Sequence, residues 1–176
     1  EAIDRDAPRV ASPLGAPQVR LPALPPDRVA GLVDIVFLAV KAHHTRIAAD
    51  QARPFLAPHG CGVSLQNGRW EVEIARSAGA QRTVGAFINF GADYVAPGRL
   101  LFANRGTVVV GEIDGRVRAR TEHIAHLLRL FEPHTQITTN IWGYLWGKTP
   151  YGALLKAEAL SKQTMADFIG DPSLQG

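Results

Sequence analysis

The sequence predicts an α/β protein: a doubly wound sheet with an antiparallel hairpin portion, followed by the start of an α-helical segment. Residues 34–40 (DIVFLAV) form an unbroken apolar run, which is typical of a strand buried on both faces of a parallel sheet. Helical and strand-like segments then alternate as far as residue 78, as in βαβ units. Beyond residue 82 strands follow one another through tight turns, which favours antiparallel hairpins.

The elements can be placed in order along the chain. Residues 1–33 are rich in proline and predict a loop with weak extended pieces and a short helical turn near 27–31. In the parallel portion we expect, after the first strand, a helix over 45–56, a strand over 62–65 closed by Asn67-Gly68, and a helix over 69–78 ended by Gly79. In the second half we expect strands over 83–94, 99–103 and 107–112, a helix over 121–131 capped by Thr121, a short strand over 136–139, and helix from Asn140 that breaks near Pro150.

Composition and charge narrow the class of protein. The 176 residues carry a net charge of +3, and the basic residues are scattered, so we expect no nucleic-acid partner. The single cysteine, Cys61, excludes an intrachain disulfide and is expected in the core. No apolar stretch is long enough to span a membrane and no leader is visible, so we expect a cytoplasmic protein. The histidines lack a third ligand at useful spacing, so no metal site is predicted.

Polar groups follow two neighbouring strands of the predicted sheet. Lys41 comes directly after the first apolar strand, and Asn67-Gly68 follows the second. Ligands of open parallel sheets bind beyond the carboxyl ends of the strands, where a lysine can meet an anion and an Asn-Gly turn can present an amide. On spacing alone the plainer alternative is favoured: a solvated lysine at a helix start, and a tight turn.

Lys148 lies within an apolar, aromatic segment, TTNIWGYLWGKTPYGALLK. A buried ammonium is costly unless it is paired or solvated. Either its stem covers Trp146 at a domain boundary while the charge reaches water, or the lysine faces a ligand.

Four motifs in order resemble the ketopantoate reductase family: DIVFLAVKAHHT, VSLQNG, PGRLLFANRGTVVVGEIDG and NIWGYLWGK. The resemblance covers residues 34–148 and implies NADPH-dependent reduction of a 2-keto acid in pantothenate biosynthesis. It also implies a partial Rossmann-like dinucleotide-binding domain over residues 1–138. Residues 139–176 would then begin a helical domain that serves substrate binding and homodimerisation.

The resemblance also assigns roles to individual residues. Lys148 is implied as the catalytic proton donor to the forming alkoxide, a charge that a nearby cation stabilises. Asn67 lies where nicotinamide and substrate meet, so it would contact both. The remaining cofactor contacts implied are Lys41, Gln66, Gly68, Gly91 and Ala92. The substrate contacts implied are Asn67, Lys148 and Gly152.

Three features depart from the family pattern. The sequence contains no GxGxxG turn, which the family has after its first strand and which would precede Glu1. The chain extends about one helix beyond Lys148, whereas the family's second domain has several helices. Gly152 and Lys156 stand where the family usually has asparagines, which predicts an altered substrate pocket. The alternatives are a non-catalytic remnant that binds a ligand or a partner, and a relative that acts on a 3-hydroxy acid or an imine.

Overall fold

The computed structural model describes residues 8–12, 15, 21–160, 162, 164–170 and 172. Its centre is a mixed sheet with the strand order β1-β5-β4-β3-β2, and β6 pairs with β5. The strands are β1 (Arg9–Ala11), β2 (Val33–Leu38), β3 (Leu56–Ser64), β4 (Thr83–Ala96), β5 (Arg99–Glu112) and β6 (Gln136–Ile137). The α-helices are α2 (Thr45–Ala52), α3 (Glu71–Ala78), α4 (Ala119–Arg129), α5 (Ile141–Glu158) and α6 (Met165–Gly170). The predicted α/β, Rossmann-like fold class is confirmed.

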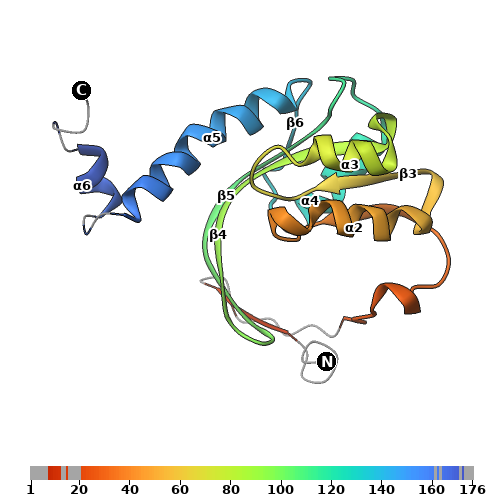
Figure 1. Cartoon of the computed structure of the whole chain (residues 1–176), viewed down its shortest axis with the longest axis horizontal. Coiled ribbons are helices and arrows are strands. Elements are labelled where there is room, and N and C mark those ends of the chain that lie inside the picture. Colours follow the sequence, from red (N-terminus) through yellow and green to blue (C-terminus); the bar gives the residue numbers. More distant parts are fainter. Residues whose placement is uncertain are drawn as a thin grey trace.

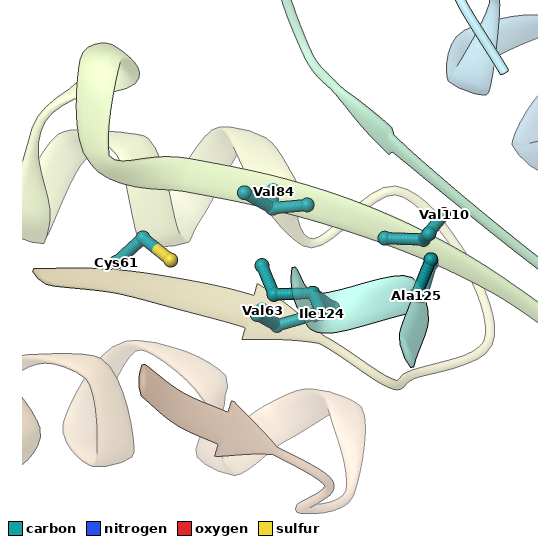
Figure 2. Packing of buried hydrophobic residues seen from close by; sticks show 7 residues of the cluster. Cys61, Val63, Val84, Val110, Ile124 and Ala125 are labelled. Carbon is teal, nitrogen blue, oxygen red and sulfur yellow. The ribbon is translucent and has the colours of Figure 1, made fainter. Parts of the chain in front are cut away.

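Strands β2, β3 and β4 are parallel neighbours, connected through α2 and α3, while β4 and β5 form the antiparallel hairpin. Helices α2 and α3 lie on one side of the sheet and α4 on the other (Figure 1). Alternate residues of a strand point to opposite faces, and β3 follows this rule. Figure 2 shows Cys61 and Val63 among the apolar side chains that pack against Ile124 of α4. A smaller cluster of Leu38, Ala49 and Ile74 fills the other face.

Cys61 is buried in this core, as predicted. Glycine lets α3 approach the sheet on the opposite face: a Cβ added to Gly62 would lie 3.2 Å from Ile74 Cγ2. Strand β3 is buried over residues 60–64. It begins earlier than the predicted 62–65, since pairing to β2 starts at Leu56. The prediction that the first apolar strand is buried on both faces is wrong, because β2 lies at the end of the strand order and Phe37 is exposed.

The β4–β5 hairpin corrects the prediction of three strands. We expected a connection at residues 104–106, but β5 runs through these residues without a break. The turn signal is instead a bulge: Asn89 pairs with Thr107 and Gly91 with Asn104, so β5 carries one extra residue there. Gly106 is required by close backbone approach, since an added Cβ would overlap the carbonyl oxygen of Asn89.

Helix α4 begins at Ala119, two residues before the predicted cap. Arg118 is the N-cap residue, and its backbone N–H donates to Thr121 Oγ1 at 3.1 Å. The Thr121 hydroxyl in turn donates to Glu112 Oε1 at 2.9 Å. Glu112 is therefore buried beneath the start of α4.

Helix α5 is continuous, so the predicted break near Pro150 is wrong. Its start agrees with the prediction, because Asn140 Oδ1 accepts from the Gly143 N–H at 3.0 Å. Proline removes one helix hydrogen bond, the one to the Trp146 carbonyl. Thr149 Oγ1 donates to the Leu145 carbonyl at 3.2 Å, which ties the side chain before the proline to the preceding turn. Beyond the sheet, α5 projects away from the rest of the fold toward α6 (Figure 1).

Candidate functional site

The loops after β2 and β3 meet at the carboxyl edge of the sheet. The Gln66 amide nitrogen donates to the Val40 carbonyl at 2.7 Å and to Thr45 Oγ1 at 2.8 Å. These two bonds tie the loop after β3 to the loop after β2. Lys41 is exposed at this edge, and its carbonyl accepts from the His44 N–H at 2.9 Å. The side chain of Lys41 is therefore available to a ligand, whereas the amide nitrogen of Gln66 already has internal partners.

The Asn67-Gly68 turn presents its amide at the same edge. Gly68 has φ +106°, a left-handed conformation that glycine adopts without strain. A Cβ there would also lie 2.8 Å from Trp70 Nε1. That indole nitrogen donates to the Asn67 carbonyl at 3.0 Å and closes the turn. The backbone of Asn67 is thus fixed, and its side chain is free to face α5.

Lys148 brings α5 and this turn together. Its Nζ donates to Asn67 Oδ1 at 2.6 Å and also to the backbone carbonyl of Ile88 in β4. The same nitrogen lies 5.4 Å from the centre of the Phe87 ring. Burial lowers the pKa of Lys148, because water is removed from around the ammonium. Lys148 is therefore half-buried, and its ammonium is oriented by two hydrogen bonds to protein oxygens.

Glycines in the sheet allow α5 to approach closely enough for this contact. Ile141 and Leu145 are buried and lie on the helix stripe that continues to Lys148. A Cβ added to Gly85 of β4 would lie 2.9 Å from Ile141 Cγ1, and one added to Gly111 of β5 would lie 3.1 Å from Ile141 Cβ. Sequence reasoning missed both glycines, although each interrupts an otherwise β-branched or apolar strand.

Two further contacts hold α5 in place. Trp142 Nε1 donates to the Ile113 carbonyl at 2.9 Å, just beyond the end of β5. Arg69 stacks on Trp146, with its guanidinium carbon 3.8 Å from the ring centre. Arg69 directly follows the Asn67-Gly68 turn, so the turn meets α5 on two sides of the helix.

A cavity of about 570 Å³ opens beside the Lys148 ammonium. It lies between β4 and α5. Its lining residues are Phe87, Asn89, Gly143, Tyr144, Gly147, Lys148 and Tyr151. Phe87 and Tyr144 face each other with ring centres 5.6 Å apart. A cation, an amide and three aromatic rings are thus gathered in one place, and only Lys148 among them was named by the sequence prediction.

The other predicted site residues lie farther from this centre. Gly91 and Ala92 follow on β4 beyond Ile88 and are not part of the cavity lining. An added Cβ at Gly91 would overlap Asn104 Oδ1, which belongs to its pairing partner in β5. Gly152 lies one helical turn beyond Lys148, and no atom would lie within 4 Å of a Cβ added there. It therefore leaves open space next to Lys148.

The family model described as "Ketopantoate reductase PanE/ApbA" matches residues 1–115, well over half of the chain. This protein belongs to the ketopantoate reductase family.

Individual relatives agree with that assignment. The 2-dehydropantoate 2-reductase of Archaeoglobus fulgidus is 30% identical over 144 residues, which cover 80% of this chain and 47% of the relative. A candidate ketopantoate reductase of Ralstonia solanacearum shares the fold with a TM-score of 0.84 at 20% identity, over 99% of this chain and 61% of that one. A PanE/ApbA family ketopantoate reductase of Ralstonia eutropha has a TM-score of 0.72 at 25% identity, over 84% of this chain and 48% of that one.

This ketopantoate reductase family chain spans about half the length of the curated relatives it matches. Within the described residues, no three His, Cys, Asp or Glu side chains converge in a way that could hold a metal ion. No helix in the described part of the chain has the length and apolar character needed to cross a membrane.

Proposed function

We propose that this protein is an NADPH-dependent reductase that converts a 2-keto acid into the corresponding 2-hydroxy acid. The observation that carries the proposal is the 2.6 Å contact between Lys148 Nζ and Asn67 Oδ1. It joins the carboxyl edge of a parallel sheet, where nucleotides bind in such folds, to a helix that faces a cavity. In overall balance, 2-keto acid, NADPH and one proton give 2-hydroxy acid and NADP⁺.

Lys148 supplies the proton in this proposal. Hydride addition to a keto carbon develops negative charge on the carbonyl oxygen, and a cation within hydrogen-bond reach stabilises that charge as it forms. The ammonium then donates one proton to the oxygen, and the pKa of Lys148, lowered by burial, eases the release. Asn67 Oδ1 and the Ile88 carbonyl hold the ammonium in one orientation.

A bound nicotinamide dinucleotide supplies the hydride. The chain fits one end of this cofactor: Lys41 and Asn67 are both exposed at the carboxyl edge of the sheet. We assign Lys41 to the cofactor site and Asn67 to the point where nicotinamide and substrate meet. Gln66, Gly68, Gly91 and Ala92 stay predicted cofactor contacts, and Gly152 stays a predicted substrate contact.

Further parts of the proposal rest on family membership. We propose NADPH over NADH, and a role in the cytoplasm in pantothenate biosynthesis, with the substrate altered from that of the family. We also propose that residues 1–138 belong to the dinucleotide-binding domain and that residues 139–176 begin a helical domain through which two copies pair.

The test is cofactor titration and turnover in the full-length protein, comparing Lys148→Met with the control Lys162→Met. Lys162 is an exposed lysine beyond the end of α5 and has no assigned role in the site. We expect Lys148→Met to lower kcat by at least ~100-fold, as for removal of a general acid, while NADPH affinity changes less than about twofold. The Lys162→Met variant should keep its turnover. Full activity of Lys148→Met would refute the assigned role, and a protein that neither binds NADPH nor reduces keto acids would be the non-catalytic remnant.

A further inference from the structure

We infer that the cavity beside Lys148 takes a 2-keto acid whose side chain is aromatic. The inference rests on the proposed function and narrows its substrate class. It starts from the lining of the cavity, which combines one cation with three aromatic rings, Phe87, Tyr144 and Tyr151. Such a lining suits a ligand with one anionic end and one flat, apolar end.

The rings form the apolar part of the cavity. Phe87 of β4 and Tyr144 of α5 have ring centres 5.6 Å apart with their planes inclined by 56°. Tyr151 lies seven residues, about two turns, beyond Tyr144 on the same side of the helix. Tyr144 and Tyr151 are 39% and 48% exposed, so both keep ring surface that a ligand can cover. Offset or edge-to-face contact with a further ring is the arrangement that such surfaces favour.

The helix leaves room beside these rings. Gly147 lies between the two tyrosines in sequence, and a Cβ added to it would meet no atom within 4 Å. No side chain of α5 therefore fills the space at this position. With about 570 Å³ available, the cavity can hold a ring in addition to the keto acid group.

The polar residues of the cavity determine which chemical group can bind at the other end of the ligand. Lys148 is the single cation among the lining residues, and Asn89 adds one amide. One cation and one amide match one carboxylate with its neighbouring keto oxygen. A ligand with several phosphates would leave most of its charge unpaired against this lining. A short aliphatic keto acid would satisfy Lys148 but leave the three rings uncovered.

The experiment compares three keto acids on the full-length protein in the presence of NADP⁺: phenylglyoxylate, its saturated analogue cyclohexylglyoxylate, and pyruvate. Calorimetric dissociation constants would be measured for the native protein and for Phe87→Leu, Tyr144→Leu and Tyr151→Leu. The control is Tyr94→Leu, because Tyr94 is exposed on the hairpin and outside the cavity lining. Lys148→Met is included to show that binding uses the proposed centre.

We expect phenylglyoxylate to bind roughly three- to tenfold more tightly than cyclohexylglyoxylate, the range that ring–ring contact supplies. This ratio should fall toward one in Tyr144→Leu and stay unchanged in Tyr94→Leu. Equal affinity for the two acids, with binding that still depends on Lys148, would overturn the inference and leave the proposed function standing. Binding of no keto acid, or binding that Lys148→Met does not weaken, would overturn both.

Discussion

Two buried glutamates in this fold have opposite surroundings. Glu112, at the end of β5, is 2% exposed and accepts from Arg120 Nε at 2.8 Å, from Arg120 Nη2 at 2.5 Å and from the Thr121 hydroxyl. Glu71, at the start of α3, is fully buried, and neither carboxyl oxygen has a hydrogen-bond partner among the described residues. The first is the anionic centre of an ion-pair network, and the second takes part in no ion pair among the described residues.

The difference shows what each acid can do. Glu112 connects the end of β5 to the first turn of α4, and Arg118 adds a third cationic contact at 3.3 Å. Burial raises the pKa of Glu71, because removing water disfavours the carboxylate by more than the positive charge of Arg69 favours it. Glu71 lies on the α3 side of the sheet, near Gly85, and Ser64 Oγ is also buried there without a partner. A partnered acid thus joins two elements, while an unpartnered one favours its neutral form.

The largest change in stability should come from removing the charge of Glu112. We expect Glu112→Gln to lower the free energy of unfolding by about 3 kcal/mol, because two guanidinium groups lose their anion in a partly buried setting. Urea denaturation would measure the change. Glu122→Gln, an exposed acid on α4, is the matched control and should change stability by less than about 0.5 kcal/mol. Equal effects of the two substitutions would show that the Glu112 network does not hold α4.

Removing the ionisable group of Glu71 should change stability by less, and in the opposite direction. The pKa of Glu71 is raised in the folded state above its ordinary value of 4.5, so above pH 4.5 the unfolded chain releases this proton first and stability falls as pH rises. We expect Glu71→Gln to stabilise the protein at pH 8 by on the order of 1 kcal/mol. The gain should disappear below pH 4.5. Urea denaturation at pH 4 and pH 8 would measure this gain in the free energy of unfolding. A gain of the same size at both pH values would contradict the raised pKa of Glu71.

The smallest effect concerns the pKa of Lys148. Its half-buried ammonium donates to two neutral oxygen atoms and has no ion-pair partner among the described residues. Asn67→Ala removes one of these acceptors and leaves the Ile88 carbonyl, so the ammonium form loses support. The pKa of Lys148, already lowered by burial, should fall further. An NMR titration of the lysine Cε resonance would follow it, with Lys156 as the reference in the same spectra. An unchanged or raised pKa would mean that Asn67 does not support the ammonium form of Lys148.

The sequence predicted much of this fold for local reasons. The apolar run of β2, the Asn67-Gly68 turn and the start of α5 at Asn140 each depend on residues close together in the chain. The errors have local causes too. Residues 104–106 have a composition typical of a turn, but in the structure they form a bulge inside β5. Pro150 carries a break signal, but α5 continues through it, because losing one helix hydrogen bond does not outweigh the rest of the helix.

The candidate site was predictable only in part. Lys148 and Asn67 could be named from motifs, because the resemblance to the family lies in those residues. Their partners could not, because Phe87, Asn89 and Tyr144 have no sequence pattern that distinguishes them from ordinary strand and helix residues. The Ile88 contact uses a backbone carbonyl, for which any residue would serve.

By itself the sequence determined the α/β class, the order of the elements and the two residues that meet at the site, since these follow from apolar periodicity, turn chemistry and family motifs. The tertiary structure decided how those residues meet. Gly85 and Gly111, far apart in the chain, bring Ile141 close to the sheet, and this places the Lys148 ammonium on Asn67. It also decided that Glu112 is hydrogen-bonded to arginines and that the Glu71 carboxyl has no hydrogen-bond partner among the described residues, because partners at a distance depend on which surfaces pack together.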